Sequence, residues 1–510
     1  MINLLIFGSI FIIFSILIFD RYKIWMSLLL LVLGSFGLGL FVSILDPFLN
    51  TWDELYHALV AKNMLVNPLK PVLYKTPILN YEIEVWTDNH IWLHKQPLFL
   101  WNIALSLKLF GVNELAVRVP SIIMHSIIPL FIFRIGNISL TRKIGFYAAL
   151  LFSVAFYPLE LVSGKYTADH NDIAFIFYIT ASIWSWFEYY RSGNRLWLIF
   201  IGIFSGFAVL VKWVLGMLVY MGWFLTLVSN FSQLFKINRY YHIIFSFCIS
   251  IIIIVPWQVF ILLKYPVESL VEYSGFSKHF STVVEGHGGG ILFHVNAIDV
   301  LYGKWMIIPI LISLVLLYSN IRLNSYKIFI LGTVIFVYTF FSIAETKMLS
   351  FCLIVSPFIF IGISLFFVKI SSLVEKLYKS KIYLLVIEKS VFLLLCVYIF
   401  NFTMLKENHD IQVKEVNNYR KNKIIERSII NKLEIYLPNK NYIIFNTKYS
   451  QGGNISFMFY SDYIAYRFIP TKEECKIVLN RGYKIAILDF GDIPDYLRIE
   501  QSIIKIPINQ

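Results

Sequence analysis

The sequence predicts an α-helical polytopic membrane protein with a small α/β domain at its C-terminal end. Composition is the first observation: 58% of the 510 residues are hydrophobic, only 15% are charged, and the mean hydropathy is +0.70. Soluble globular domains carry roughly 25% charged residues, so this composition excludes an ordinary soluble protein. A series of long apolar segments and a polar tail after residue 404 are the other two observations.

The apolar segments predict about twelve transmembrane helices, because a span needs about 20 apolar residues. They lie at about 4–19, 24–45, 119–135, 144–162, 171–190, 196–210, 213–228, 242–263, 301–318, 326–343, 348–368 and 383–404. We expect a hairpin with Lys212 at its tip, rather than one long helix, over 196–228. The run 97–110 is apolar too, but a further span would reverse everything after it, so we expect it to be interfacial or re-entrant.

The charge pattern predicts the orientation. Lys and Arg outnumber Asp and Glu by 44 to 31, which gives a net charge of +13. In a polytopic protein such an excess indicates basic cytoplasmic loops rather than nucleic-acid binding. The twelve spans put the basic clusters on one side. We therefore expect a plasma (inner) membrane protein whose first outer loop 46–118, long outer loop 264–300 and tail face the exterior.

Two domains are expected, a membrane domain over 1–404 and a soluble extracytoplasmic domain over 405–510. The last 106 residues hold 28 of the 75 charged residues. Short apolar runs at Tyr442–Phe445 and Ile485–Leu488, bounded by turn residues, predict strands, and 410–436 predicts a helix.

Two adjacent carboxylates, Asp53 and Glu54, lie just past the second predicted span. A carboxylate in a dry pocket is able to act as a general base on an acceptor hydroxyl. The alternative is structural: Asp53 caps a helix over 54–64. Spacing alone leaves both open.

His94 and Lys95 precede the apolar run 97–110 in the same loop. A lysine there is suited to a phosphate, and histidine is a common metal ligand. Anchoring of a helix end at the lipid headgroups is the alternative.

The polar run 163–172 contains Asp169, His170 and Asp172. Together with His94, Asp169 and Asp172 are the candidate ligands for a divalent metal such as Mg, Mn or Zn. A short connecting loop is polar by default, however, and the spacing matches no strong metal motif.

Lys212 and Lys347 lie at the outer ends of apolar segments, where an anionic headgroup would sit. Pairing with Glu345 is the structural alternative for Lys347. In the long outer loop, His287, Gly288 and Gly289 belong to a glycine-rich run that is suited to a lid over substrate.

Five short motifs occur in an order that resembles one group of polytopic glycosyltransferases. They are Asp53-Glu54, Lys95-Gln96-Pro97-Leu98, Leu109–Ser121, Gly206–Lys212 and Ser342–Lys347. Together they resemble the lipid A aminoarabinose transferase (ArnT)-like and protein O-mannosyltransferase-like enzymes, which have the GT-C fold. The resemblance covers about residues 46–360.

The resemblance implies transfer of a sugar from a polyprenyl-phosphate donor to an acceptor hydroxyl or phosphate on the periplasmic face, with a lipid A-like glycolipid, a protein or a glycan as acceptor. The first-loop acid of the family is a catalytic base, a role that falls on Asp53 with Glu54 beside it. Lys95 corresponds to the basic residue near the donor phosphate, where Lys212 and Lys347 are the other candidate cations. The metal-site or phosphate-site carboxylate corresponds to Asp172 or Asp169.

Departures from the family pattern leave the sugar, the acceptor and the metal open. Tyr56 stands where aminoarabinose transferases have arginine, and His94 stands where they have glutamate. Direct attack by the acceptor predicts inversion at the anomeric carbon.

Other classes remain in competition. A lipid or polysaccharide transporter (flippase) also needs a polytopic bundle with buried charges, and a membrane scaffold with an exterior module is a third candidate. Transporters place their charged sites near the midplane, in interrupted helices. Here the charged candidates gather at one face, which favours an enzyme.

Overall fold

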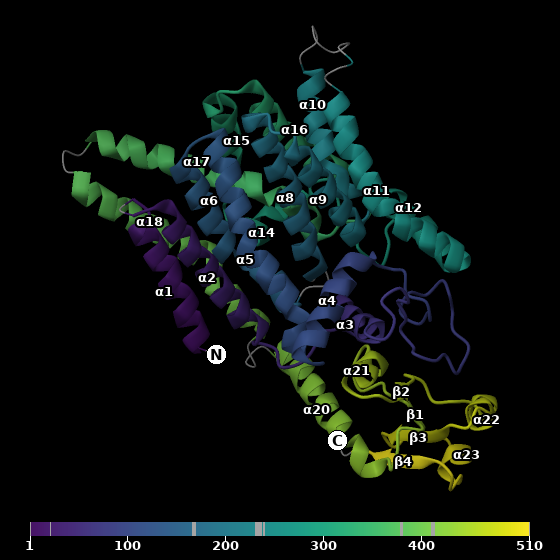
Figure 1. Ribbon diagram of the computed structural model, residues 1–510. Helices are drawn as coiled ribbons and strands as arrows, with labels where there is room; N and C mark the ends of the chain where they lie inside the picture. Colours follow the sequence, from purple (N-terminus) through teal and green to yellow (C-terminus); the bar gives the residue numbers. More distant parts are fainter. Residues whose placement is uncertain are drawn as a thin grey trace. The chain divides into compact units, whose positions relative to one another are not determined.

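The structure, a computed structural model, describes residues 2–20, 22–165, 170–229, 237, 240–377, 381–409 and 414–508. The chain divides into two compact units (Figure 1). We call the first the membrane unit; it holds residues 1–44, 121–266 and 272–405. We call the second the loop–tail unit; it holds residues 45–120, 267–271 and 406–510.

The membrane unit is built from helices, three of which (α5, α12 and α19) also have residues in the loop–tail unit. In chain order the helices are α1 (Ile2–Ile18), α2 (Ile24–Ser43), α5 (Glu114–Ser139), α6 (Arg142–Val154), α7 (Phe156–Ser163), α8 (His170–Ser192), α9 (Leu196–Lys212), η1 (Val214–Met217), α10 (Leu218–Val228), α11 (Tyr241–Lys264), α12 (Pro266–Ser281), α13 (Phe293–Asn296), α14 (Ile298–Tyr302), α15 (Ile307–Asn320), α16 (Asn324–Ile343), η4 (Leu349–Val355), α17 (Ser356–Leu377), α18 (Lys381–Phe400) and α19 (Phe402–His409).

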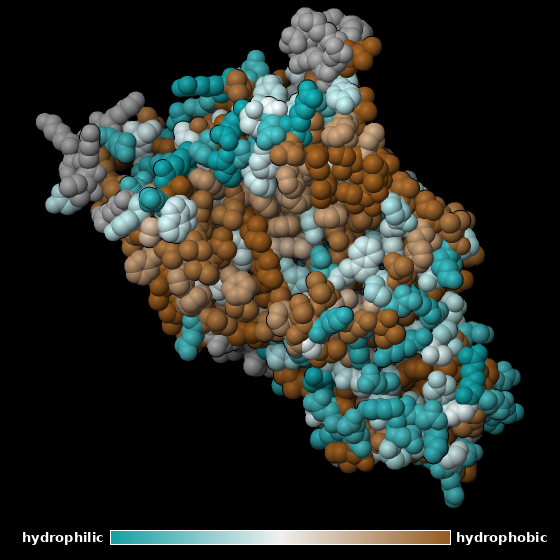
Figure 2. Space-filling model, viewed as in Figure 1, coloured by the Kyte–Doolittle hydropathy of each residue, from teal (hydrophilic) through white to brown (hydrophobic). Residues whose placement is uncertain are grey.

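The outer surface of the membrane unit is apolar. Ile252 and Leu263 of α11 are 69% and 80% exposed, and Leu394 of α18 is 68% exposed. Figure 2 shows hydrophobic side chains over much of the face that α11 forms. Side chains of this kind are stable at a surface only when lipid covers them. The prediction of a polytopic membrane protein is confirmed.

The number of spans stays a prediction. Among the described residues, six helical segments are long and apolar enough to cross a membrane, or eight if each of two bent pairs is one span. The bent pairs are α6 with α7, at 44°, and α13–α14 with α15, at 99°. Three further predicted spans correspond to α1, α9 and the η1–α10 segment, which are apolar but shorter than 18 residues.

The chain turns at the residue expected for a hairpin tip. Helix α9 ends at Lys212, and Trp213 takes a left-handed φ of 63°. The 3-10 helix η1 then packs back on α9 so closely that a Cβ on Gly216 would lie 2.4 Å from the Val209 nitrogen. Lys212 is thereby placed at the end of its helix.

The loop–tail unit combines two helices of the first outer loop with a small α/β fold. Its elements are α3 (Asp53–Met64), α4 (Pro97–Phe110), α20 (Lys414–Tyr436), β1 (Tyr442–Phe445), α21 (Gly453–Tyr460), β2 (Ile464–Ala465), α22 (Lys472–Asn480), β3 (Lys484–Asp489), α23 (Asp495–Arg498) and β4 (Ile504–Pro507). The four strands form a parallel sheet in the order β2-β1-β3-β4. Both predicted strands and the predicted helix, from residue 414 onward, are present.

Contacts within this unit join the first outer loop to the tail. The Lys62 ammonium on α3 donates to the carbonyls of Met458, Phe459 and Ser461, at 2.8–3.0 Å, where α21 ends. The Tyr419 hydroxyl accepts from the backbone nitrogen of Thr51 at 2.9 Å. The predicted division at residue 404 grouped 46–118 with the membrane helices, whereas these contacts group 45–120 with the tail.

Candidate active site

The two neighbouring carboxylates at the start of α3 have different surroundings. Glu54 is fully buried and pairs with Arg118, whose Nε lies 2.7 Å from Glu54 Oε1. Arg118 also donates to the carbonyls of Asp46 and Phe48 at 2.8 and 2.7 Å. Arg118 thus links the Glu54 carboxylate to the backbone of the preceding loop. Because breaking a buried ion pair leaves an uncompensated charge, Glu54 holds the loop before α3 in place. This contact favours a structural role for Glu54. Its predicted share in catalysis stays a prediction.

Asp53 keeps access to solvent. Its side chain is 16% exposed and pairs with Lys95, whose Nζ lies 3.2 Å from Asp53 Oδ2. Trp52 holds the cap position of α3 and Asp53 is the first helical residue, so the alternative in which Asp53 caps the helix does not apply. The structure thus brings together the predicted base and the predicted phosphate-binding cation, which are 42 residues apart in the sequence.

Lys95 is placed by the start of α4. Gln96 takes an extended conformation at the cap of this helix and Pro97 occupies its first turn, where a missing N–H costs nothing. The Lys95 side chain is 19% exposed. A lysine that is held at a rigid helix start and is partly exposed is suited to a phosphate oxygen.

His94 lies in an aromatic cluster. Its ring stacks on Trp86 with centroids 4.5 Å apart and an interplanar angle of 7°, and meets the edge of Trp92 at 5.7 Å. These rings fix the plane of the imidazole.

The membrane unit contains a second pairing of two predicted residues. Asp172, in the first turn of α8, forms an ion pair with Lys212 at the end of α9. The Asp172 side chain is 6% exposed and the Lys212 side chain is 24% exposed. The Lys212 ammonium also lies over the ring of Phe351, 5.4 Å from its centroid. Each residue therefore neutralises the other in the absence of a ligand.

Lys347 binds backbone carbonyls instead of Glu345. Its ammonium donates to Phe341 and Ser342 at 3.1 and 2.8 Å, and also to Ala344. These carbonyls lie at the C-terminal end of α16, where a cation is favourable. The structural alternative, a pair with Glu345, is not what these contacts form, and the predicted contact of Lys347 with a donor phosphate stays a prediction.

The glycine-rich run is attached to the segment that contains Lys347. The Lys347 nitrogen donates to the His287 carbonyl at 2.7 Å, and the Thr346 nitrogen donates to the His279 carbonyl at 3.1 Å. A Cβ on Gly289 would lie 3.3 Å from Lys347 Cγ, so Gly289 permits this close approach. Gly288 lies two residues after Gly286, which has a positive φ of 76°. The role of 287–289 as a lid stays a prediction.

The described residues do not fit the predicted metal site. Asp169 lies outside them. Asp172 is engaged with an ammonium, which competes with a metal cation for the same carboxylate. Within the described ranges, no three His, Cys, Asp or Glu side chains form a group suited to a metal ion.

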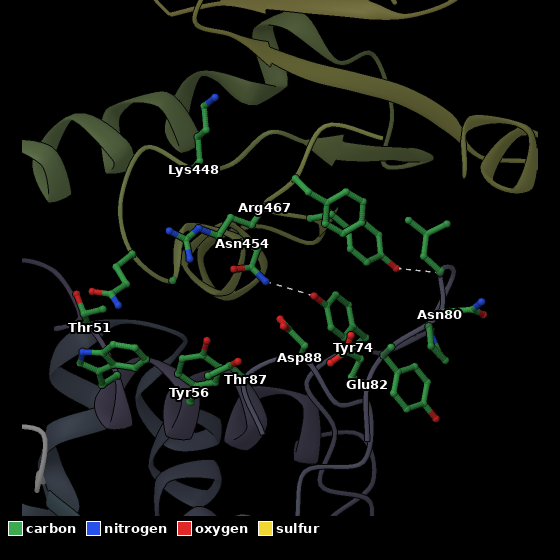
Figure 3. A pocket seen from close by; sticks show the side chains of 18 residues that line it. Thr51, Tyr56, Tyr74, Asn80, Glu82, Thr87, Asp88, Lys448, Asn454 and Arg467 are labelled. Carbon is green, nitrogen blue, oxygen red and sulfur yellow. Dashed lines mark hydrogen bonds between the residues drawn. The ribbon is translucent and has the colours of Figure 1, made fainter. Parts of the chain in front are cut away.

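A pocket in the loop–tail unit escaped the sequence analysis. Figure 3 shows it between the first outer loop, which contributes Trp52, Tyr56 and Asp88, and the tail, which contributes Asn454 and Arg467. Burial, and then the charge of Glu82, raise the pKa of Asp88, and the charge of Arg467 partly offsets this rise.

Arg118 is a second functional residue that the sequence analysis missed. Its signal in the sequence is an arginine directly before a predicted span.

Comparison with known families and structures gives consistent results. Residues 94–260, one third of the chain, match the model of the dolichyl-phosphate-mannose-protein mannosyltransferase family. An uncharacterized protein of Aquifex aeolicus is 29% identical over 205 residues, which are 39% of this chain and 37% of that protein. The chain therefore matches less than two-fifths of the length of this relative.

Solved structures match over almost the whole chain. ArnT from Cupriavidus metallidurans bound to undecaprenyl phosphate is 13% identical, with a TM-score of 0.59 over 94% of this chain and 89% of that one. The oligosaccharyltransferase AglB from Archaeoglobus fulgidus, in complex with an inhibitory peptide and a dolichol-phosphate, is 12% identical, with a TM-score of 0.58 over 92% of this chain and 69% of that one. At such identities the likeness concerns the fold. The chain is a polytopic membrane protein with the GT-C glycosyltransferase fold.

Proposed function

We propose that this protein is a glycosyltransferase that moves a sugar from a polyprenyl-phosphate donor to an acceptor hydroxyl on the extracytoplasmic face of the plasma membrane. The pair of Asp53 and Lys95 carries this proposal. A carboxylate and an ammonium 3.2 Å apart, both partly exposed, are the two groups that such a transfer needs. The family match over 94–260 and the lipid phosphates named for the ArnT and AglB structures support the donor class.

The proposed reaction is a single displacement. The acceptor oxygen forms a bond to the anomeric carbon of the sugar while the bond from that carbon to the phosphate oxygen breaks. The acceptor proton passes to Asp53, and polyprenyl phosphate leaves with the bonding electron pair. Lys95 stabilises the charge on the departing phosphate. Attack from the face opposite the leaving group inverts the anomeric carbon.

Glu54 and Arg118 act as positioning residues in this scheme. Their buried pair fixes the backbone from Asp46 to the start of α3, and therefore the place of Asp53. No step is assigned to a metal, and the contribution of Lys212 and Lys347 to donor binding stays a prediction.

Native mass spectrometry of the detergent-purified chain with undecaprenyl phosphate tests the donor class. We expect a lipid adduct that weakens at least tenfold in Lys95→Ala. Lys108 is an exposed lysine in the last turn of α4, the helix that Lys95 precedes. Lys108→Ala is therefore the matched control and keeps the adduct. Absence of an adduct in every protein, or equal adducts in all three, overturns the assignment.

The base is tested by turnover with sugar-linked undecaprenyl phosphates as donors. Asp53→Asn is nearly isosteric, so it should retain the lipid adduct and lose transfer by about 10²–10⁴-fold, the usual contribution of a general base. Normal turnover in Asp53→Asn rejects Asp53 as the base and leaves the donor assignment intact.

A further inference from the structure

The pocket of the loop–tail unit has the size of a ligand site. Its volume is about 770 Å³, within the range of about 300–1,000 Å³ that small-molecule sites occupy. All of its walls belong to one compact unit: Trp52 and Tyr56 of α3, the loop from Tyr74 to Asp88, and the tail segments 448–454 and 466–468. A pocket inside one unit does not depend on how the two units are arranged.

Hydrogen bonds and stacking hold its walls in place without a ligand. The Asn454 side-chain amide donates to the Tyr74 hydroxyl at 3.3 Å. The Tyr466 hydroxyl accepts from the backbone nitrogens of Ile78 and Leu79, at 3.3 and 3.1 Å. The rings of Tyr74 and Tyr466 stack with centroids 5.3 Å apart. A preformed pocket loses little entropy on binding.

The charges in the pocket disfavour a phosphate or another strong anion. Lys448 is neutralised by Asp492, with which it forms an ion pair. The other charged side chains that line the pocket are Arg467, Asp88 and Glu82. Figure 3 shows Arg467 and Asp88 extending from opposite walls toward the same space. With the charge of Lys448 balanced, two carboxylates and one guanidinium remain. This set suits a neutral ligand that donates and accepts hydrogen bonds.

The aromatic side chains add flat apolar surfaces beside these polar groups. Trp52 and Tyr56 line the pocket from α3, and Tyr81 and Phe468 line it from the loop and the tail. A pyranose ring has C–H faces that pack on aromatic rings and hydroxyl edges that bind carboxylate, amide and guanidinium groups. A lipid chain offers no such alternation.

We propose that this pocket binds the carbohydrate portion of the acceptor, a neutral polyhydroxylated glycan. The proposal rests on the proposed function and narrows its acceptor class. Trp52 lines the pocket and is followed directly by Asp53, with Tyr56 one turn further along α3. A glycan bound on Trp52 therefore contacts the residue that directly precedes the one proposed to take the proton from its hydroxyl.

A printed array of neutral oligosaccharides, anionic oligosaccharides and peptides, probed with the full chain in nanodiscs, tests the proposal without any donor. We expect binding to a subset of the neutral oligosaccharides, weakened at least tenfold by Asp88→Asn and by Arg467→Gln. Glu473→Gln, an exposed acid of α22 outside the pocket, is the matched control and leaves binding unchanged. Binding to none of the glycans, preference for peptides or for anionic oligosaccharides, or equal binding by all variants overturns it.

The undecaprenyl phosphate adduct of each variant is measured in parallel and also reports folding. We expect Asp88→Asn and Arg467→Gln to retain it. Lipid binding without any glycan binding rejects the pocket proposal alone. Glycan binding that depends on Asp88, in a chain that never binds the lipid, rejects the donor assignment alone.

Discussion

Adjacent residues of one helix serve different purposes because their solvation differs. Glu54 has no exposed surface and its charge is balanced by Arg118, so removal of either partner leaves an uncompensated buried charge. Asp53 forms an ion pair with Lys95, and both side chains are partly exposed to water. A partly exposed pair exchanges partners at smaller cost than a buried one. In the proposed mechanism, that property allows Lys95 to move from a carboxylate to a phosphate.

His90 should make the loop–tail unit sensitive to acid. Burial, and then the charge of Lys70, lower the pKa of His90 to about 4 in the folded chain, compared with about 6.5 when unfolded. The unfolded chain therefore binds the proton first as the pH falls. The stability due to neutral His90 is complete above about pH 6.5 and is lost toward pH 4, by about 2 kcal/mol at pH 5.

Hydrogen exchange of the backbone around His90 measures this effect. The Leu73 nitrogen donates to the His90 carbonyl and the Trp92 nitrogen to the Pro71 carbonyl, so these amides report local opening. After correction for intrinsic exchange, protection should be weaker at pH 5 than at pH 7. His90→Gln should remove the difference, and an equal pH response in that variant contradicts the prediction.

The individual site residues were easier to predict than their partners. Asp53, Lys95, Asp172 and Lys212 stand out in the sequence because charges are rare beside apolar segments. That Asp53 would pair with Lys95, and Asp172 with Lys212, was not predicted, since such contacts depend on how helices far apart in the chain pack.

At the level of elements, small residues set the distances between membrane helices. Gly145 of α6 packs against α5 so closely that a Cβ would lie 2.4 Å from the Phe133 carbonyl oxygen. Gly8 and Gly34 make a similar approach between α1 and α2, where added Cβ atoms would lie 2.9 and 2.8 Å from the facing helix. Close backbone packing of this kind is what holds helices together in lipid.

Gly145→Ala should therefore destabilise the membrane unit. The new methyl group meets backbone, which cannot rotate away, so α5 and α6 must move apart at a cost of about 1–3 kcal/mol. Thermal unfolding in detergent measures the loss as a lower Tm. Gly275→Ala of α12 is the matched control, because a Cβ there meets nothing within 4 Å. Equal Tm values for both variants contradict the prediction.

Helix positions were predictable because apolar runs are long and unambiguous. The breaks within them were not predicted, although local residues account for them. The 44° bend between α6 and α7 occurs at Ala155, three residues before Pro158, which has no N–H to bond the Val154 carbonyl. The predicted span 301–318 is divided at Gly303, with α15 beginning only at Ile307. Both breaks therefore lie beside a helix-breaking residue, Pro158 or Gly303, within an apolar run that is long enough to be read as one span.

For the whole molecule, the expected orientation is testable by labelling. In a Cys248→Ser background, Ser502→Cys in the tail should react with a membrane-impermeant maleimide in intact spheroplasts. Ser192→Cys, at the end of α8 beside Arg191, should react only after permeabilisation, since basic loops remain in the cytoplasm. The reverse pattern would place the tail in the cytoplasm and reject the extracytoplasmic proposal.

The organisation of the whole chain was the least predictable level. Composition separated a polar tail from the membrane helices near residue 404, close to the boundary of the membrane unit at Leu405. That the first outer loop joins this tail was not visible, because Lys62 binds carbonyls almost 400 residues away. The pocket was invisible for the same reason, since its two walls share no local pattern.

The separation of the pocket walls also bears on the order of synthesis. Asp88 and Arg467 are about 380 residues apart, and at about 5–20 residues per second a ribosome needs roughly 20–80 s to make the chain between them. During that interval the first outer loop, already exported if the orientation is right, lacks the side chains of the tail that complete the pocket. A chain whose translation stops early therefore never acquires a finished acceptor pocket, even when all its membrane helices have been inserted.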